Sequence, residues 1–124
     1  MKIQKLVQVK GVFAPFVRTR LSPKLSYKLL KFLKAIEFEE KFFNSKVKEL
    51  LNEFGQKDKQ GKYITENGNI KIIEGKEEAC TNAFNELNDL EVSVPDITFT
   101  LEELKDITLS VQDIAIIEDF IKEE

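Results

Sequence analysis

The chain has 124 residues, of which 42% are hydrophobic, and a net charge of −3; these values fit one domain with its own core and exclude a wholly disordered chain. One cysteine and no histidine exclude an internal disulfide and a zinc site built from cysteine and histidine within one chain. No segment approaches the roughly 20 apolar residues that span a bilayer, and the first ten residues lack a signal-peptide core, so we expect a cytoplasmic protein without membrane contact.

Charge is distributed unevenly along the chain. Residues 1–36 carry nine basic side chains and no acidic one, residues 37–73 carry seven of each sign, and residues 74–124 carry fifteen acidic side chains against three lysines. Two interpretations remain open. The two ends attract each other or lie on separate solvated faces of one fold, or they form two surfaces of opposite charge for partners.

The first segment predicts a strand. Gly11 and Pro15 interrupt a β-favouring mixture with imperfect alternation, formed by Ile3, Leu6, Val7 and Val9. We therefore expect an N-terminal strand region over residues 1–16.

A long amphipathic helix is predicted over residues 22–55. Ser22 and Pro23 are typical of a helix start, and Gly55 of a helix end. Between them the apolar residues recur at helical spacing: Leu25, Leu29, Phe32, Ile36, Phe43, Val47, Leu50 and Phe54. At about 1.5 Å per residue such a helix is about 48 Å long. This length exceeds the diameter of a compact domain of this size, so we expect that one end of the helix projects, bends or packs on another copy.

The rest of the chain predicts a hairpin and shorter helices. Asn67-Gly68 between β-branched residues indicates a hairpin over residues 62–73. The acidic part, residues 76–124, is expected to be helical, with a short strand over residues 90–94 and two or three shorter helices. Two of its helix starts carry capping-box spacing, Thr100 with Glu103 and Ser110 with Asp113. The predicted fold class is α+β: a single domain, residues 1–124, with one long helix, a small antiparallel hairpin and shorter C-terminal helices.

Catalytic machinery is not recognisable in the sequence. The absence of histidine removes the commonest general base near neutral pH, and Cys80 lies on an apolar helical stripe that predicts a buried, inert thiol. Neighbouring carboxylates on a helix usually point into water, so a metal-dependent hydrolase is the least favoured hypothesis. We expect a protein that is not an enzyme and holds no metal or cofactor.

The basic N-terminal segment is the clearest candidate for binding. Three lysines recur at i, i+4 and i+7 and share a helix face. With their neighbours the candidate residues are Arg18, Arg20, Lys24, Lys28, Lys31 and Lys34. They form either a solvated face or a contact for an acidic protein surface, a second copy included. Nucleic acid is a less favoured partner because the chain is acidic overall.

Several segments resemble a family of small, uncharacterised proteins encoded by tailed phages and prophages of low-GC Gram-positive bacteria. They are Arg18-Thr19-Arg20, the helix end Glu49 to Gly55, the Asn67-Gly68-Asn69 turn and Ala83 to Leu87. The resemblance implies a phage accessory protein, in the host cytoplasm or associated with the virion. It supplies no catalytic or binding residue.

The leading hypothesis is a non-enzymatic interaction protein with a role in particle assembly. Its partner would be a phage structural protein or a host defence protein, and a homodimer through the long helix is a further expectation. An alternative is an inhibitor of a host defence nuclease, in which carboxylates stand where phosphates would lie. The acidic residues proposed for that surface are Glu102, Glu103, Asp106, Glu118 and Asp119.

Overall fold

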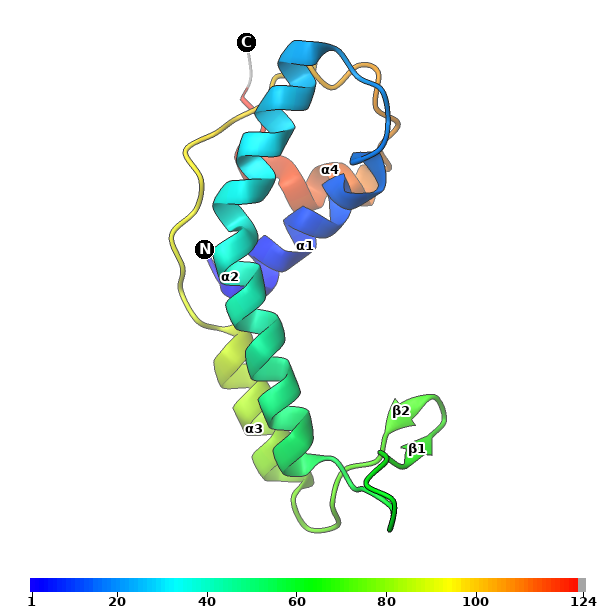
Figure 1. Ribbon diagram of the computed structural model, residues 1–124. Helices are drawn as coiled ribbons and strands as arrows, with labels where there is room; N and C mark the ends of the chain where they lie inside the picture. Colours follow the sequence, from blue (N-terminus) through cyan, green and yellow to red (C-terminus); the bar gives the residue numbers. More distant parts are fainter. Residues whose placement is uncertain (123–124) are drawn as a thin grey trace.

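The fold is α+β, as predicted, and consists mainly of helices (Figure 1). The computed structural model describes residues 1–122. In chain order its elements are α1 (Ile3–Phe13), η1 (Ala14–Phe16), α2 (Pro23–Phe54), β1 (Thr65–Glu66), β2 (Asn69–Ile70), α3 (Glu77–Asn88), α4 (Val111–Ile117) and η2 (Glu118–Phe120).

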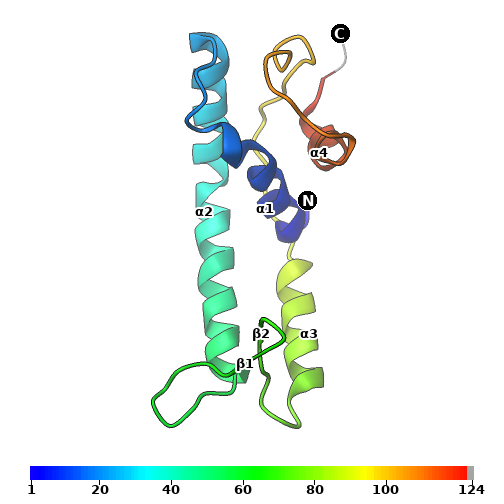
Figure 2. The same cartoon turned by 90° about the vertical axis from the view of Figure 1, so that its right-hand side faces the viewer.

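The helix α2 runs along the molecule, and the other elements pack around its two halves as two parts (Figures 1 and 2). We call residues 1–36 and 97–122 the head, where α1 and α4 lie beside the N-terminal half of α2. We call residues 37–90 the stem, where α3 runs antiparallel to the C-terminal half of α2 and the hairpin extends from the far end. The segment between α3 and α4 returns along α2 from the stem to the head.

The predicted bounds of the long helix are confirmed. The Ser22 side chain accepts a hydrogen bond from the Leu25 N–H, and Pro23 is the first helical residue. Gly55 ends the helix with φ −76°, a value that any residue can adopt. Backbone conformation therefore does not explain why a glycine stands at this position. A Cβ at this position would lie 2.5 Å from the Leu51 carbonyl oxygen and 2.8 Å from the Tyr63 ring. The glycine is required by close packing at the end of α2.

The predicted N-terminal strand is wrong: residues 3–13 form the helix α1. Its buried residues are Ile3, Leu6, Val9, Val12 and Phe13, and their steps of three, three, three and one place them on one helical face. Gly11 does not interrupt the helix but lies exposed within it, and Pro15 lies in η1. Burial of a helical face against α2 outweighs the weak β preference of the valines.

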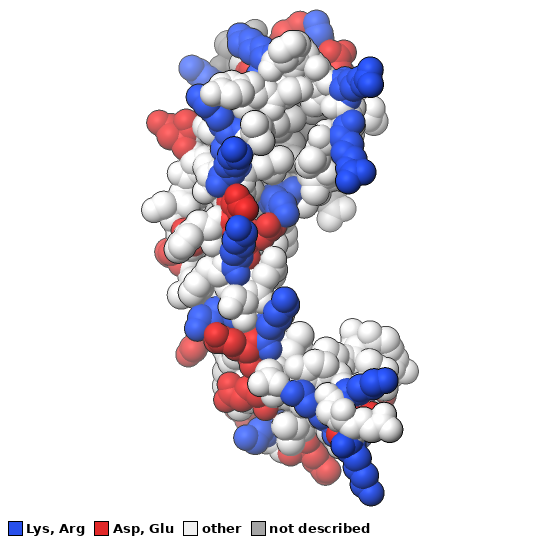
Figure 3. Space-filling model, viewed as in Figure 1, with Lys and Arg blue, Asp and Glu red and all other residues white. Residues whose placement is uncertain are grey.

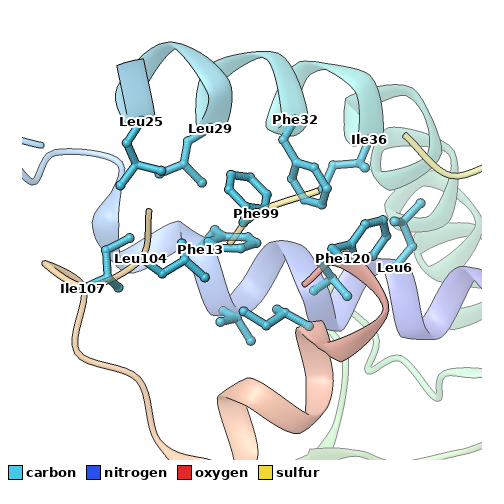
Figure 4. Packing of buried hydrophobic residues seen from close by; sticks show 13 residues of the cluster. Leu6, Phe13, Leu25, Leu29, Phe32, Ile36, Phe99, Leu104, Ile107 and Phe120 are labelled. Atoms are coloured by element: carbon cyan, nitrogen blue, oxygen red, sulfur yellow. The ribbon is translucent and has the colours of Figure 1, made fainter. Parts of the chain in front are cut away.

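The core of the head is a cluster of phenylalanines (Figure 4). The Phe32 ring packs against three others, with centroid distances of 5.5 Å to Phe13, 5.4 Å to Phe99 and 5.0 Å to Phe120. Each ring comes from a different part of the chain: α2, α1, the segment before α4, and η2. Aromatic pairs at such distances contribute about 0.5–1.5 kcal/mol each beyond their area burial.

The predicted hairpin is confirmed in residues 65–70. Thr65 pairs with Ile70 and Glu66 with Asn69 in an antiparallel register. Asn67 and Gly68 both have positive φ, 53° and 82°, as the tight two-residue turn requires.

The C-terminal part differs from prediction in two places. The strand predicted over residues 90–94 is wrong, because only Glu91 forms a bridge, with Lys2. The Thr100–Glu103 capping box forms, but turns rather than a helix follow it. The Ser110–Asp113 box caps α4 as predicted. Of the predicted acidic part, residues 123 and 124 lie outside the described residues.

No helix within residues 1–122 combines the length and apolarity needed to cross a bilayer.

Two glycine substitutions test these assignments. Gly55→Ala should destabilise the protein by about 1–3 kcal/mol, because the new methyl group meets backbone and ring atoms. Gly11→Ala should stabilise it by up to about 1 kcal/mol, because alanine is the better helix former and nothing lies within 4 Å of the added Cβ. Urea unfolding followed by circular dichroism measures both. A destabilising Gly11→Ala would contradict the helical assignment of α1.

Candidate docking surface

Several charges of the two ends neutralise each other within the molecule. The Met1 amino group lies 2.9 Å from Glu91, Lys2 3.2 Å from Asp89 and Lys28 2.9 Å from Glu103. Each pair joins the basic first third of the sequence to the acidic last third. The interpretation that the ends attract each other therefore holds for these residues.

Lys28 is engaged by the protein itself. Its Nζ donates to both carboxylate oxygens of Glu103, at 2.9 and 3.0 Å, and lies 5.1 Å from the centroid of the Phe99 ring. The carboxylate also accepts a hydrogen bond from the Thr100 N–H. Lys28 and this backbone donor hold the pKa of Glu103 below its usual range. Lys28, one of the predicted basic binding residues, thus connects α2 to the turn before α4 through its pair with Glu103.

The other five basic candidates are exposed, and none of them makes an ion pair with a carboxylate of residues 1–122. They are Arg18, Arg20, Lys24, Lys31 and Lys34. Lys24 stands apart from the rest, because it lines a hollow of about 380 Å³ together with Glu102, Glu103 and Asp106. Its surroundings are acidic.

An apolar groove of about 100 Å³ lies between the N-terminal half of α2 and the loop that leads into it. Its walls are Phe13, Phe16, Val17, Thr19, Leu21, Ser26, Leu29, Leu30 and Leu33. Val17 and Leu30 remain 64% and 48% exposed. The two residues give the groove an open, apolar rim.

Four of the free cations belong to the two elements that form this groove, the loop and α2. Arg18 and Arg20 alternate along the loop with the lining residues Val17, Thr19 and Leu21. On α2, Lys31 and Lys34 follow directly after the lining residues Leu30 and Leu33, and each is therefore turned about 100° round the helix from them, toward solvent. In the upper half of Figure 3, which views the molecule from the same side as Figure 1, an uncharged area has basic side chains along both of its margins. We call the groove and these four residues the docking groove.

An exposed aromatic ring lies next to Lys31 on α2. Tyr27 is 60% exposed and lies one turn before Lys31, whose Nζ is 4.8 Å from the ring centroid. The tyrosine thus adds a flat apolar contact beside Lys31. Rings with a polar tip are frequent anchors in protein interfaces.

The proposed acidic residues do not form one uniform surface. Glu103 pairs with Lys28, and Glu102 pairs with Lys105 at 2.9 Å, which raises the pKa of Lys105. Asp106 shares a hollow with Lys24 and Lys105. Glu118 and Asp119 lie exposed on η2 and line no part of that hollow.

Cys80 is buried on α3, as predicted, and its burial raises the pKa of the thiol. Within residues 1–122 no three side chains of histidine, cysteine, aspartate or glutamate are placed to hold a metal ion together.

The sequence already contained a signal for the groove. Leu30 and Leu33 fall outside the apolar stripe of α2 that faces the core, and apolar residues off such a stripe indicate a second contact surface. The contribution of Val17 and Leu21 could not be read in this way, because irregular loops have no periodicity.

Comparison with known proteins gave no match: no family model, curated protein or solved structure is similar to the chain. The resemblance to small phage proteins therefore stays a prediction.

The Lys28–Glu103 pair should make stability depend on pH. Since the pKa of Glu103 is lower in the folded than in the unfolded chain, the pair stabilises the protein above the ordinary glutamate pKa of about 4.3 and loses its effect as pH falls through the lowered value. Glu103→Gln should reduce stability at pH 7 by about 1 kcal/mol, and the difference from wild type should shrink below about pH 4. Denaturant unfolding at several pH values measures it.

Glu102→Gln is the matched control. Its pair with Lys105 is exposed and should contribute little at any pH. Equal pH profiles for the two variants would show that Lys28 does not stabilise the Glu103 carboxylate.

Proposed function

We propose that the protein is a non-enzymatic interaction module that binds an acidic segment of a partner protein in the docking groove. A side chain of the partner, leucine- or phenylalanine-like, fills the apolar groove. Carboxylates on either side of it pair with Arg18 and Arg20 on the loop and with Lys31 and Lys34 on α2.

The observation that carries this proposal is that both elements forming an open apolar groove, the loop and α2, carry cations that make no ion pair with a described carboxylate. An apolar centre with a charged rim is the usual arrangement of specific protein interfaces. The rim charges speed encounter and select an acidic partner, while the apolar anchor supplies most of the affinity. Cations that serve only solubility do not require exposed apolar residues beside them, whereas Leu30 and Val17 are exposed next to these cations.

We propose further that this module is a phage accessory protein, as the sequence resemblance implies, and that its partner is a structural protein of the particle. The nuclease-inhibitor alternative rests on the acidic residues of the C-terminal part. It is less well supported, because Glu102 and Glu103 pair with lysines and Lys24 lies among them.

Charge reversal of the groove tests the proposal. A tagged protein is used to capture partners from phage-infected cells, and the affinity for the captured protein is then measured by calorimetry. Lys31→Glu with Lys34→Glu should weaken binding at least tenfold, on the order of 1.4 kcal/mol, because like charges would meet across the interface. Binding to the wild type should weaken with added salt.

Lys48→Glu with Lys59→Glu is the matched control, since it changes the net charge equally at exposed positions of the stem without ion pairs to described residues. This variant should bind like wild type. Equal binding by the groove variant would locate the contact elsewhere. A captured nuclease whose inhibition depends on Glu118 and Asp119 would support the alternative.

A further inference from the structure

The stem lacks the second layer that a pair of amphipathic helices needs. The buried core cluster takes its α2 members from the head alone, the last being Ile36. Beyond it only Phe54, Cys80 and Leu87 of α2 and α3 are buried. Phe38 and Phe42 are exposed, and further apolar residues of this helix pair are only partly buried: Phe43, Val47, Leu50, Leu51, Ala83 and Phe84. Two helices side by side form one layer, and stable folds cover such a layer with another.

The large accessible surface area of the chain agrees with an apolar stem surface that no other part of the chain covers. The accessible surface is 8878 Å², whereas a compact monomer of 14.3 kDa exposes roughly 6,800 Å² by the general scaling with mass. The excess of roughly 2,000 Å² arises from the elongated shape, in which the stem extends away from the head (Figure 1).

One side of the stem carries an apolar groove of about 250 Å³ between α2 and α3. Its walls are Phe42, Lys46, Leu50, Ala83, Glu86, Leu87 and Leu90. Phe42 and Leu90 are 37% and 42% exposed. One cation, Lys46, and one anion, Glu86, interrupt the lining of this groove, so it is complementary to itself in charge. Within one copy the partly exposed Lys46 side chain pairs with Glu49 at 3.1 Å and lies over the Phe42 ring; such a surface pair contributes little and can exchange its partner.

We propose that a second copy of the chain covers this groove and that the two stems form a four-helix bundle. A two-fold axis parallel to α2 places α2 of one copy opposite α3 of the other. Lys46 of each copy then faces Glu86 of the other, and the Phe42 and Leu90 side chains are buried between them. This surface is distinct from the docking groove in the head, so a dimer presents two docking grooves.

The available area sets the expected strength. Residues 38–54 of α2 extend over about 25 Å, and two helices are together about 20 Å wide. Each copy therefore offers roughly 500 Å², or roughly 1,000 Å² for both, which lies at the lower limit of specific interfaces. We expect a dimer with a Kd near micromolar rather than an obligate one.

Sedimentation equilibrium of the full chain tests the dimer. At roughly a hundred micromolar, well above a micromolar Kd, the mass should be twice 14.3 kDa. Phe42→Glu with Leu90→Glu should give a monomer with an unchanged circular dichroism spectrum, because both side chains are already partly exposed. Leu101→Glu with Val111→Glu is the matched control at exposed apolar positions of the head and should still dimerise.

Charge exchange tests the orientation of the two copies. Lys46→Glu and Glu86→Lys should each weaken self-association, because like charges then face each other. An equimolar mixture of the two variants should form a heterodimer as strong as the wild-type dimer. A monomeric wild type at high concentration, or a dimer that survives Phe42→Glu with Leu90→Glu, would overturn the proposal.

Discussion

The packing of Phe32 against three other phenylalanines is the contact on which the head depends. Its partners Phe13, Phe99 and Phe120 come from segments far apart in the chain, so the cluster fixes how α1, α2 and the C-terminal part meet. The Lys28–Glu103 pair lies beside it, with Lys28 over the Phe99 ring. By holding α1 and η1 against α2, the cluster also positions the loop that forms one wall of the docking groove.

The continuity of α2 has a different consequence at its other end. A helix of 32 residues is longer than the head is wide, and its C-terminal half leaves the phenylalanine core. There α3 covers only part of its apolar stripe. The same helix thus carries an exposed basic face in the head and an uncovered apolar face in the stem, and the two surfaces suit different partners: an acidic segment and a second copy.

Charge asymmetry along the sequence has two structural roles rather than one. Lys28 and Lys2 form ion pairs with carboxylates of the acidic part of the same chain. Arg18, Arg20, Lys31 and Lys34 form no ion pair with a described carboxylate, and they belong to the loop and the helix that form the apolar groove. A division of this kind depends on which side chains the fold brings together.

Local patterns determined α2, the hairpin and the caps, because a Ser-Pro start, an Asn-Gly turn and helical spacing of apolar residues act over a few residues. The α1 segment was misread because β-branched residues favour strands only weakly, and burial against α2 decided otherwise. The basic residues were visible in the sequence, but their separation into Lys28, which is paired, and Lys31 and Lys34, which are free, was not. Ion pairs, grooves and uncovered faces join residues distant in sequence, and only the tertiary packing brings those residues within contact distance.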